Sequence, residues 1–257
     1  MKMELLSGKE LPYICTPIIG KNDDELIVEL RKIVPKKPDI IEWRVDFYDE
    51  IDNIEKVLLS AEMISKNSDN IPILFTIRSS KEGGEDITLS EEGIVELLTT
   101  VCKTDYIQMV DFEGSNNPEN IKQLRKVSKE HQKKLILSYH NFELTPDKTE
   151  ICKRLLLAEF YGADMAKAAV MPNNKKDVLA LLEVTRELNE TMNIPLITMS
   201  MGGLGSVSRI LGWVYGSAVT FAVGEKSSAP GQIPLEDLRQ VIEITKKSMG
   251  QDSYNLI

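Results

Sequence analysis

The sequence has few of the residues from which metal centres and disulfide frameworks are built. Among 257 residues there are only two histidines and three cysteines. The cysteines, Cys15, Cys102 and Cys152, lie far apart and show no CxxC spacing. We therefore expect reduced thiols and no disulfide framework. A zinc site is not expected either, because a site built on histidine needs a cluster of them.

Positive charge and long apolar runs are also scarce. The formal net charge is -9, which argues against nucleic acid as a partner, because such a protein needs a basic surface to replace counterions. No apolar run approaches the roughly 20 residues that span a bilayer, and residues 1–6 lack the apolar stretch of a secretory signal. We expect a cytoplasmic protein without membrane contact. The initial methionine and the final helix lead us to expect a whole chain rather than a piece of a longer polypeptide.

What the sequence does contain is a regular alternation of short apolar runs and amphipathic stretches. The expected strands are 13–19, 39–46, 71–78, 105–113, 134–140, 164–172, 194–200 and 218–223. The expected helices are 22–34, 54–64, 89–102, one that begins at 117, 146–161, 175–192, 206–215 and 235–249. Each strand is thus followed by a helix, and this order is typical of an α/β protein with a parallel sheet.

The number of these units predicts the architecture. Eight βαβ-type units in 257 residues, with no change of composition that suggests a linker, favour a single (β/α)8 barrel domain over residues 1–257. The rival fold is an open doubly wound sheet, which usually has fewer strands and often a glycine-rich first turn. The first turn here, Gly20-Lys21-Asn22, lacks that pattern, so we expect the barrel.

One predicted strand, 164–172, carries Lys167 in its middle. An unpaired ammonium in an apolar strand costs several kcal/mol or loses its proton more easily, and a lysine amine without its proton can condense with a ketone as a Schiff base. The alternative is a lysine whose stem runs through apolar packing to water. Taken alone, the strand favours that alternative, because lysine is rarely fully buried.

The active site of such a barrel lies at the carboxyl ends of its strands, and polar residues are predicted there. Glu42, Arg44 and Asp46 share one face of the second strand, because side chains alternate along a strand. His140 ends the fifth strand, next to the lysine strand, and is the histidine placed for acid–base work. The other histidine, His131, lies in a charged helix end and is expected to be solvated.

Two further strand ends carry arginine and glycine. Arg78 ends the third strand and is a candidate for anion binding, and the loop 79–88 behind it contains two adjacent glycines that permit movement. The seventh strand runs into the glycine-rich stretch 199–205, with Arg209 about one turn into the next helix. Glycines before a helix N-terminus can form an anion cradle, although a tight turn explains them equally well.

The loop after the eighth strand completes the predicted site. Residues 226–232 are small and polar, which suits a lid with Ser228 and Gln232 as hydrogen-bond donors, although an ordinary loop is the alternative. With Lys167, His140, three arginines and at least two carboxylates at one barrel mouth, we expect an anionic substrate and prefer the Schiff-base interpretation of the lysine. The arginines would also lower the pKa of that lysine.

These segments resemble one known family, the type I 3-dehydroquinate dehydratases of the shikimate pathway. The segments, in order, are Glu42-Trp43-Arg44-Val45-Asp46, Thr76-Ile77-Arg78-Ser79, Glu82-Gly83-Gly84-Glu85, His140, Lys167 in Lys-Ala-Ala-Val-Met-Pro, Met199-Ser200-Met201-Gly202 with Ser208-Arg209, and Ser228-Ala229-Pro230-Gly231-Gln232. The resemblance runs from the first strand to the last helix, and several motifs in the right order are more specific than any one alone.

The resemblance implies a lyase that removes water from 3-dehydroquinate by syn elimination, giving 3-dehydroshikimate. Lys167 would form an imine with the ketone. His140 would act as general base and then as general acid, and Glu82 would tune it. Neither a metal nor a dissociable cofactor is implied. The family is typically dimeric, so we expect a homodimer.

The same resemblance implies how substrate binds. Arg209 and Gln232 would hold the substrate carboxylate. The residues expected to contact its hydroxyls, or to close over it, are Glu42, Arg44, Arg78, Ser228 and Ala229. Two rivals stay open on the residues alone: a class I aldolase that uses the same lysine, and a non-catalytic ligand-binding relative.

The sequence departs from the family pattern beside the lysine. Ala168 stands where the family usually has isoleucine, and Ala166 where it often has isoleucine or proline. Tyr139, before the histidine, replaces a more polar residue. No departure removes a catalytic group, but the small alanines lead us to expect looser packing around Lys167.

Overall fold

A computed structural model describes residues 12–250 of the chain. The strands are β1 Tyr13–Ile18, β2 Ile40–Arg44, β3 Ile73–Thr76, β4 Met109–Glu113, β5 Lys134–Asn141, β6 Met165–Val170, β7 Leu196–Ser200, β8 Val219–Val223 and β9 Ile233–Pro234. The α-helices are α1 Asp23–Ile33, α2 Ile54–Asn67, α3 Glu91–Cys102, α4 Pro118–Glu130, α5 Lys148–Phe160, α6 Lys175–Thr191, α7 Gly202–Leu211 and α8 Leu235–Met249. Short 3-10 helices are η1 Val34–Lys36, η2 Val45–Phe47, η3 Ser80–Glu82 and η4 Gly212–Tyr215.

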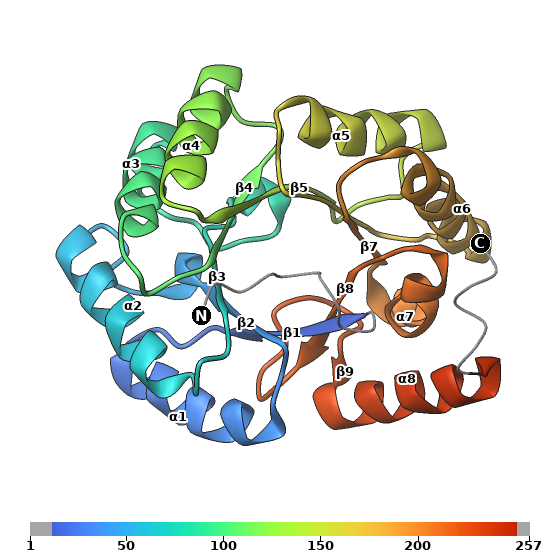
Figure 1. The fold of residues 1–257 in the computed structure, drawn as a ribbon, viewed down its shortest axis with the longest axis horizontal. Coiled ribbons are helices and arrows are strands. Elements are labelled where there is room, and N and C mark those ends of the chain that lie inside the picture. Colours follow the sequence, from blue (N-terminus) through green and yellow to red (C-terminus); the bar gives the residue numbers. More distant parts are fainter. Residues whose placement is uncertain (1–11, 251–257) are drawn as a thin grey trace.

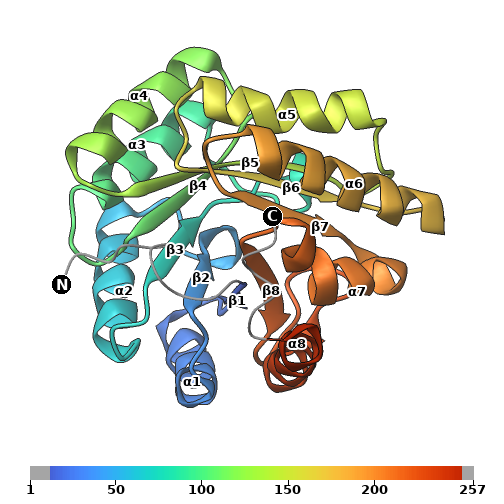
Figure 2. The same cartoon turned by 45° about the vertical axis from the view of Figure 1, so that its right-hand side comes forward.

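The strands form one curled parallel sheet inside a ring of helices (Figure 1). Their order is β7-β6-β5-β4-β3-β2-β1-β8-β9. The sheet closes where Leu196 of β7 pairs with Ser217, just before β8, and the Ala218 N–H donates to the Leu196 carbonyl at 2.7 Å. The turned view in Figure 2 again shows the strands enclosed by the helices. The predicted (β/α)8 barrel is therefore confirmed, with β9 as a short addition outside it.

Side-chain alternation divides the core into an inner and an outer part. In β6, Met165 and Ala169 belong to the apolar cluster inside the barrel, whereas Ala166 and Ala168 belong to the cluster between barrel and helices. Lys167, between them, therefore points inward. The expectation that the two alanines loosen the packing around Lys167 was wrong, because they face the helices on the opposite side of the strand.

Most helices begin at a side chain that caps them. Asn22 accepts from the Glu25 N–H ahead of α1, and Asn174 with Asp177 forms a capping box at α6. The boundary errors are largest, at four residues, for β4, which starts at Met109 and not at 105, and for α7, which starts at Gly202 and not at 206. Gly205 lies inside this helix, where a Cβ would come within 2.3 Å of the Ser200 carbonyl oxygen. Gly205 therefore allows α7 to pack closely on the end of β7.

Several predictions concern features that the structure describes only in part. Within residues 12–250, no helix has the length and apolar run that crossing a membrane requires. In the same range, no group of three or more histidine, cysteine or acidic side chains is arranged to hold a metal ion. The three cysteines are free thiols. The prediction for residues 1–6 and both ends of the predicted domain, 1–257, lie outside the described residues.

Candidate active site

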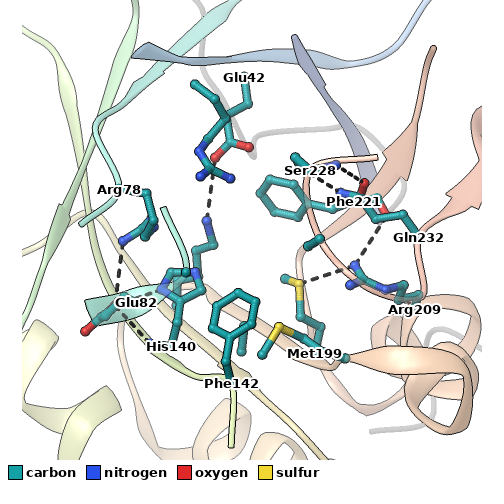
Figure 3. A pocket seen from close by; sticks show the side chains of 16 residues that line it. Glu42, Arg78, Glu82, His140, Phe142, Met199, Arg209, Phe221, Ser228 and Gln232 are labelled. Carbon is teal, nitrogen blue, oxygen red and sulfur yellow. Dashed lines mark hydrogen bonds and ion pairs between the residues drawn. The ribbon is translucent and has the colours of Figure 1, made fainter. Parts of the chain in front are cut away.

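A pocket opens at the carboxyl ends of the strands, where the sequence predicts the site. It is lined by all ten residues expected there: Glu42, Arg44, Arg78, Glu82, His140, Lys167, Arg209, Ser228, Ala229 and Gln232. Figure 3 shows Arg78, Glu82 and His140 on one side of this pocket and Arg209, Ser228 and Gln232 on the opposite side. Four large apolar side chains also line the pocket, and no role was predicted for any of them: Phe142, Met199, Met201 and Phe221.

Lys167 is 5% exposed, and its amine lies between two carboxylates. Nζ is 3.1 Å from Asp111 Oδ2 and 3.7 Å from Glu42 Oε1, and it lies 4.6 Å from the centre of the Phe221 ring. The interpretation of a stem that carries its charge to water is therefore wrong for Lys167. The charged groups in contact with the amine are thus the carboxylates of Asp111 and Glu42, not arginines.

Arg78 forms hydrogen bonds with several residues on the side of the pocket that holds Asp111 and Glu82. Its guanidinium donates to Asp111 Oδ1 at 2.6 Å, to Ser138 Oγ at 2.8 Å and to Glu113 Oε1 at 3.3 Å. Burial alone would lower the pKa of Arg78, but the carboxylates of Asp111, Glu113 and Glu82 outweigh it and raise the pKa above its usual value. Arg78 is thus engaged by the protein itself.

Neither Asp111 nor Glu113 was identified as a site residue from the sequence. Both side chains point into the barrel from β4, because Met109 on the same face belongs to the inner cluster. The available signal was a strand that ends with two acids at a spacing of two. Burial alone would raise the pKa of Asp111, but Arg78 and Lys167 outweigh burial and hold the pKa below its usual range.

His140 is bound to Glu82, as the resemblance implied for these two residues. His140 Nδ1 lies 2.9 Å from Glu82 Oε2, which also accepts from the His140 backbone N–H at 3.0 Å. Burial, and then the charges of Arg78 and Lys167, hold the pKa of His140 well below its ordinary value. Burial and repulsion from Glu113 raise the pKa of Glu82 to about 8. Because Nδ1 is occupied, Nε2 is the ring nitrogen left for a ligand.

Arg44 is held by a neighbour on its own strand end. Its Nε and Nη2 donate to the two oxygens of Asp46 at 2.9 and 2.7 Å, which is a bidentate pair. Asp46 also accepts from the backbone N–H groups of Arg78 and Glu85. The three-residue face predicted for 42–46 therefore holds a carboxylate that lines the pocket, an arginine and the partner that orients it.

Arg209 has a very different environment. It is 1% exposed, and its donors reach Met199 Sδ at 3.5 Å and the carbonyl oxygens of Phe221 and Pro230 at 3.4 and 3.1 Å. Its Nε is buried without a hydrogen-bond partner among residues 12–250. Burial lowers the pKa of Arg209 to about 10, so the group keeps its charge at neutral pH. A buried cation that no carboxylate of the described residues contacts is costly, and an anionic ligand would relieve that cost.

Glycines in two loops around the pocket have close neighbours. The Gly202 N–H, in the stretch 199–205, donates to the Pro230 carbonyl and is therefore not free to bind an anion. The two glycines of loop 79–88 are held tightly: a Cβ on Gly83 would come within 2.2 Å of the Phe142 ring, and on Gly84 within 2.0 Å of the Arg78 carbonyl oxygen. These glycines permit close packing against Phe142 and the Arg78 backbone.

The lid residues bond to each other in the structure. The Ser228 N–H donates to Gln232 Oε1 at 3.0 Å, and Gln232 Nε2 donates to Ser228 Oγ at 3.2 Å. Ala229 lies between them in sequence and lines the pocket. The second histidine, His131, is half-buried at the end of α4 and outside this pocket.

Comparison with known proteins gives one consistent result. A family profile described as type I 3-dehydroquinase matches residues 14–249. A 3-dehydroquinate dehydratase from Geobacillus sp. (strain WCH70) is 52% identical, over 94% of this chain and 93% of that protein. The crystal structure of 3-dehydroquinate dehydratase from Geobacillus kaustophilus HTA426 superposes with a TM-score of 0.91 at 44% identity, covering 94% and 93% of the two chains.

A second solved structure agrees. It is the type I 3-dehydroquinate dehydratase from Clostridium difficile with covalently modified comenic acid, 40% identical, with a TM-score of 0.90 and coverage of 94% and 95% of the two chains. The profile and these relatives span nearly the whole described barrel, including every strand that contributes to the pocket. The chain belongs to the type I 3-dehydroquinase family.

Proposed function

We propose that the chain dehydrates 3-dehydroquinate to 3-dehydroshikimate through an imine on Lys167. The relatives that share about half of its residues are named 3-dehydroquinate dehydratases, and such an enzyme is a hydro-lyase. The observation that carries the proposal is a buried primary amine in the same enclosed pocket as a histidine with one nitrogen left for a ligand. The Clostridium difficile relative carries covalently modified comenic acid, which is in keeping with a nucleophilic residue in that protein.

The amine supplies an electron sink. Lys167 attacks the ketone carbon, one water leaves, and a protonated C=N bond forms. This cation acidifies the hydrogens on the neighbouring carbon, because the electron pair released there can move to nitrogen. His140 takes that proton at Nε2. The same proton then goes to the departing hydroxyl, so the elimination is syn. Water finally releases the product and restores the amine.

Glu82 sets the state of the histidine. When ionised, its carboxylate accepts a hydrogen bond from the Nδ1–H of a neutral imidazole. The lone pair on Nε2 is then free to act as base. The lowered pKa of His140 favours that neutral ring. When Glu82 is protonated it must donate to Nδ1 instead, and the remaining ring proton then sits on Nε2, where it blocks base catalysis.

Arg209 supplies the place for the substrate carboxylate. Its guanidinium is a buried cation that no carboxylate of residues 12–250 contacts, so an anionic ligand would gain a charge-assisted hydrogen bond there. Gln232 and Ser228 lie on the same side of the pocket. Glu42 and Arg44 remain candidates for the substrate hydroxyls. Arg78 is assigned a supporting role, because its donors serve Asp111, Glu113 and Ser138.

The reaction as proposed needs no dissociable cofactor or metal, because the lysine itself forms the electron sink. The class I aldolase alternative is disfavoured, because the relatives named above are dehydratases. A non-catalytic relative is disfavoured because both Lys167 and His140 line the pocket. The homodimer and the cytoplasmic location remain predictions.

The test is direct conversion of substrate. Purified protein is incubated with 3-dehydroquinate, and the ultraviolet absorbance of the conjugated product is followed while mass spectrometry records the loss of one water. We expect rapid conversion without added metal or cofactor, including in the presence of a chelator. Unchanged substrate would contradict the proposal, and fragments from carbon–carbon cleavage would point to the aldolase.

A further inference from the structure

The carboxylate nearer to the Lys167 amine belongs to a residue that does not line the pocket. Asp111 Oδ2 is 3.1 Å from Nζ, and Asp111 is completely buried. Glu42, the second carboxylate, is 3.7 Å away and lines the pocket. From this geometry we infer that Asp111 is the counter-ion that keeps the Lys167 imine protonated during the elimination. The inference rests on the proposed function.

The contacts of Asp111 divide between its two oxygens. Oδ1 accepts from Arg78 Nη2 at 2.6 Å and from Ser138 Oγ at 2.6 Å. Oδ2 is left for Lys167. One oxygen therefore fixes the carboxylate to the barrel, and the other faces the reacting nitrogen. Ser138 lies directly opposite Lys167 in the pairing of β5 with β6, which holds this arrangement in register.

The chemistry requires charge on that nitrogen at two stages. Condensation of the amine with the ketone releases water and leaves a C=N–H cation, whose remaining N–H can donate to Asp111 Oδ2. Removal of the neighbouring proton sends the C–H electron pair to nitrogen and neutralises it. The hydroxyl then departs as water with a proton from the imidazolium. Its departure draws the nitrogen electron pair back into a C=N bond, and the nitrogen is again cationic. A fixed anion beside nitrogen stabilises the cation at both stages.

A neutral imine would be a much weaker electron sink. An anion within about 4–6 Å favours the protonated form of its neighbour and shifts its titration by roughly one to three units. Asp111 stays ionised at neutral pH because Arg78 and Lys167 hold its pKa below the usual range. Its role is thus electrostatic: it accepts a hydrogen bond from the reacting nitrogen and makes no contact with the pocket lumen.

The chain offers a matched control at the other end of the same barrel. Asp164, just before β6, also sits between an arginine and a lysine, at 2.6 Å from Arg125 Nη1 and 3.2 Å from Lys134 Nζ. It precedes the strand that carries Lys167 and is outside the pocket. The substitution Asp164→Asn removes the same charge from the same kind of triad and does not touch the reacting nitrogen.

The experiment compares Asp111→Asn with Asp164→Asn in three measurements. The first is borohydride trapping on Lys167, which we expect in wild type and both variants, because imine formation needs only the amine. The second is kcat, which we expect to fall roughly hundredfold in Asp111→Asn, at the low end of the loss from removing one preorganised electrostatic group, and to stay at the wild-type value in Asp164→Asn.

The third measurement is the pH profile of kcat. Its alkaline limb should move to lower pH by about one to three units in Asp111→Asn, because the imine there loses its proton more easily. A purely structural role would lower kcat without moving this limb. An Asp111→Asn enzyme with wild-type kcat and an unmoved limb would overturn the inference. Absence of a trapped adduct in wild type would instead overturn the proposed function.

A second test avoids the variant altogether, in case Asp111→Asn does not fold. Wild-type enzyme labelled with 15N-lysine is saturated with product, and nitrogen NMR reports whether the imine nitrogen carries a proton. We expect a protonated imine at neutral pH and above. A neutral imine nitrogen at neutral pH would overturn the inference.

Discussion

Each side of the pocket contains a buried arginine, and the two arginines differ in whether carboxylates surround them. On one side, Arg78 is surrounded by Asp111, Glu113 and Glu82, and these carboxylates raise its pKa. On the other side, Arg209 donates to carbonyl oxygens and a thioether, and burial lowers its pKa to about 10. Arg78 belongs to a network whose charges are paired before any ligand arrives.

This difference suggests that the side with Arg78 positions the reacting residues and that the side with Arg209 binds the substrate. Paired charges hold Lys167 and His140 in place, since both residues are tied into the Arg78 network through Asp111 and Glu82. An unpaired buried cation is costly in the free protein and is relieved when an anion binds. We therefore expect changes on the paired side to act on kcat and stability, and changes at Arg209 to act mainly on KM.

The largest expected effect is that of Lys167→Ala. It removes the nucleophile from the paired side, so elimination should become undetectable, and borohydride should add no mass. A matched control is Lys133→Ala: Lys133 is also buried, but its amine donates to the Ile107 carbonyl at 2.8 Å outside the pocket. Near-normal turnover in Lys167→Ala would contradict the assignment, as would loss of activity in a folded Lys133→Ala protein.

His140→Ala should come next. Loss of the general base should reduce kcat by roughly 10²- to 10⁴-fold, while the imine still forms and is still trapped by borohydride. Activity and trapping are measured on the same sample. The control is His131→Ala, which changes the chain's other histidine and should leave both measurements unchanged. A failure of His140→Ala to trap would mean that the histidine acts earlier than proposed.

Arg209→Met tests the unpaired side. Loss of a hydrogen bond to a charged group costs about 1.5–3 kcal/mol, so kcat/KM should fall roughly 10- to 100-fold, chiefly through KM. The free energy of unfolding should not fall, because the substitution removes a buried cation that no carboxylate of the described residues contacts. Steady-state kinetics and denaturant unfolding check both parts. A fall in kcat at unchanged KM would break the comparison.

Arg78→Met is the matched substitution on the paired side. It leaves Asp111 and Glu113 buried without their common partner, so the free energy of unfolding should fall by about 3–5 kcal/mol. The measurement is denaturant unfolding beside that of Arg209→Met. Equal stability of the two variants would show that the two arginines are energetically alike and that the contrast between the two sides of the pocket does not hold.

The smallest expected effect is on the pH dependence. The pKa of Glu82 is raised to about 8 from an ordinary value of 4.5. Below about 8 the residue keeps its proton and blocks the base form of His140, so kcat/KM should rise with pH up to about 8. The same raised pKa means that the protonated residue favours the fold, and this contribution to stability is lost as the pH rises through about 8. Glu82→Gln should remove both slopes, which activity and denaturant unfolding across the pH range would measure.

The sequence predicts the barrel well because alternation is a local property. Apolar runs and capped helices each depend on neighbouring residues, and eight of them in order leave little choice of fold. Strand ends place His140 and Arg78 at one mouth for the same reason. The short strand β9 could not be predicted, because its two residues carry no periodic pattern.

What the sequence could not predict depends on contacts between distant segments. Asp111 is one of 40 acidic residues, and the two acids that end its strand do not show by themselves which of them contacts Lys167. The glycines of 199–205 suggest an anion cradle by their spacing, but spacing does not show that Gly205 is the point where α7 approaches the end of β7 most closely. The contacts of Lys167 could not be predicted for the same reason: strand ends place arginines and carboxylates at the mouth without saying which carboxylates reach the lysine or which arginines are already paired.

The most direct test of the imine mechanism is to map the covalent adduct. Wild-type protein is incubated with 3-dehydroquinate and sodium borohydride, digested, and analysed by peptide mass spectrometry. The mechanism predicts a reduced adduct on Lys167 and none on Lys133, a second buried lysine. An unmodified Lys167 in protein that still converts the substrate would contradict it.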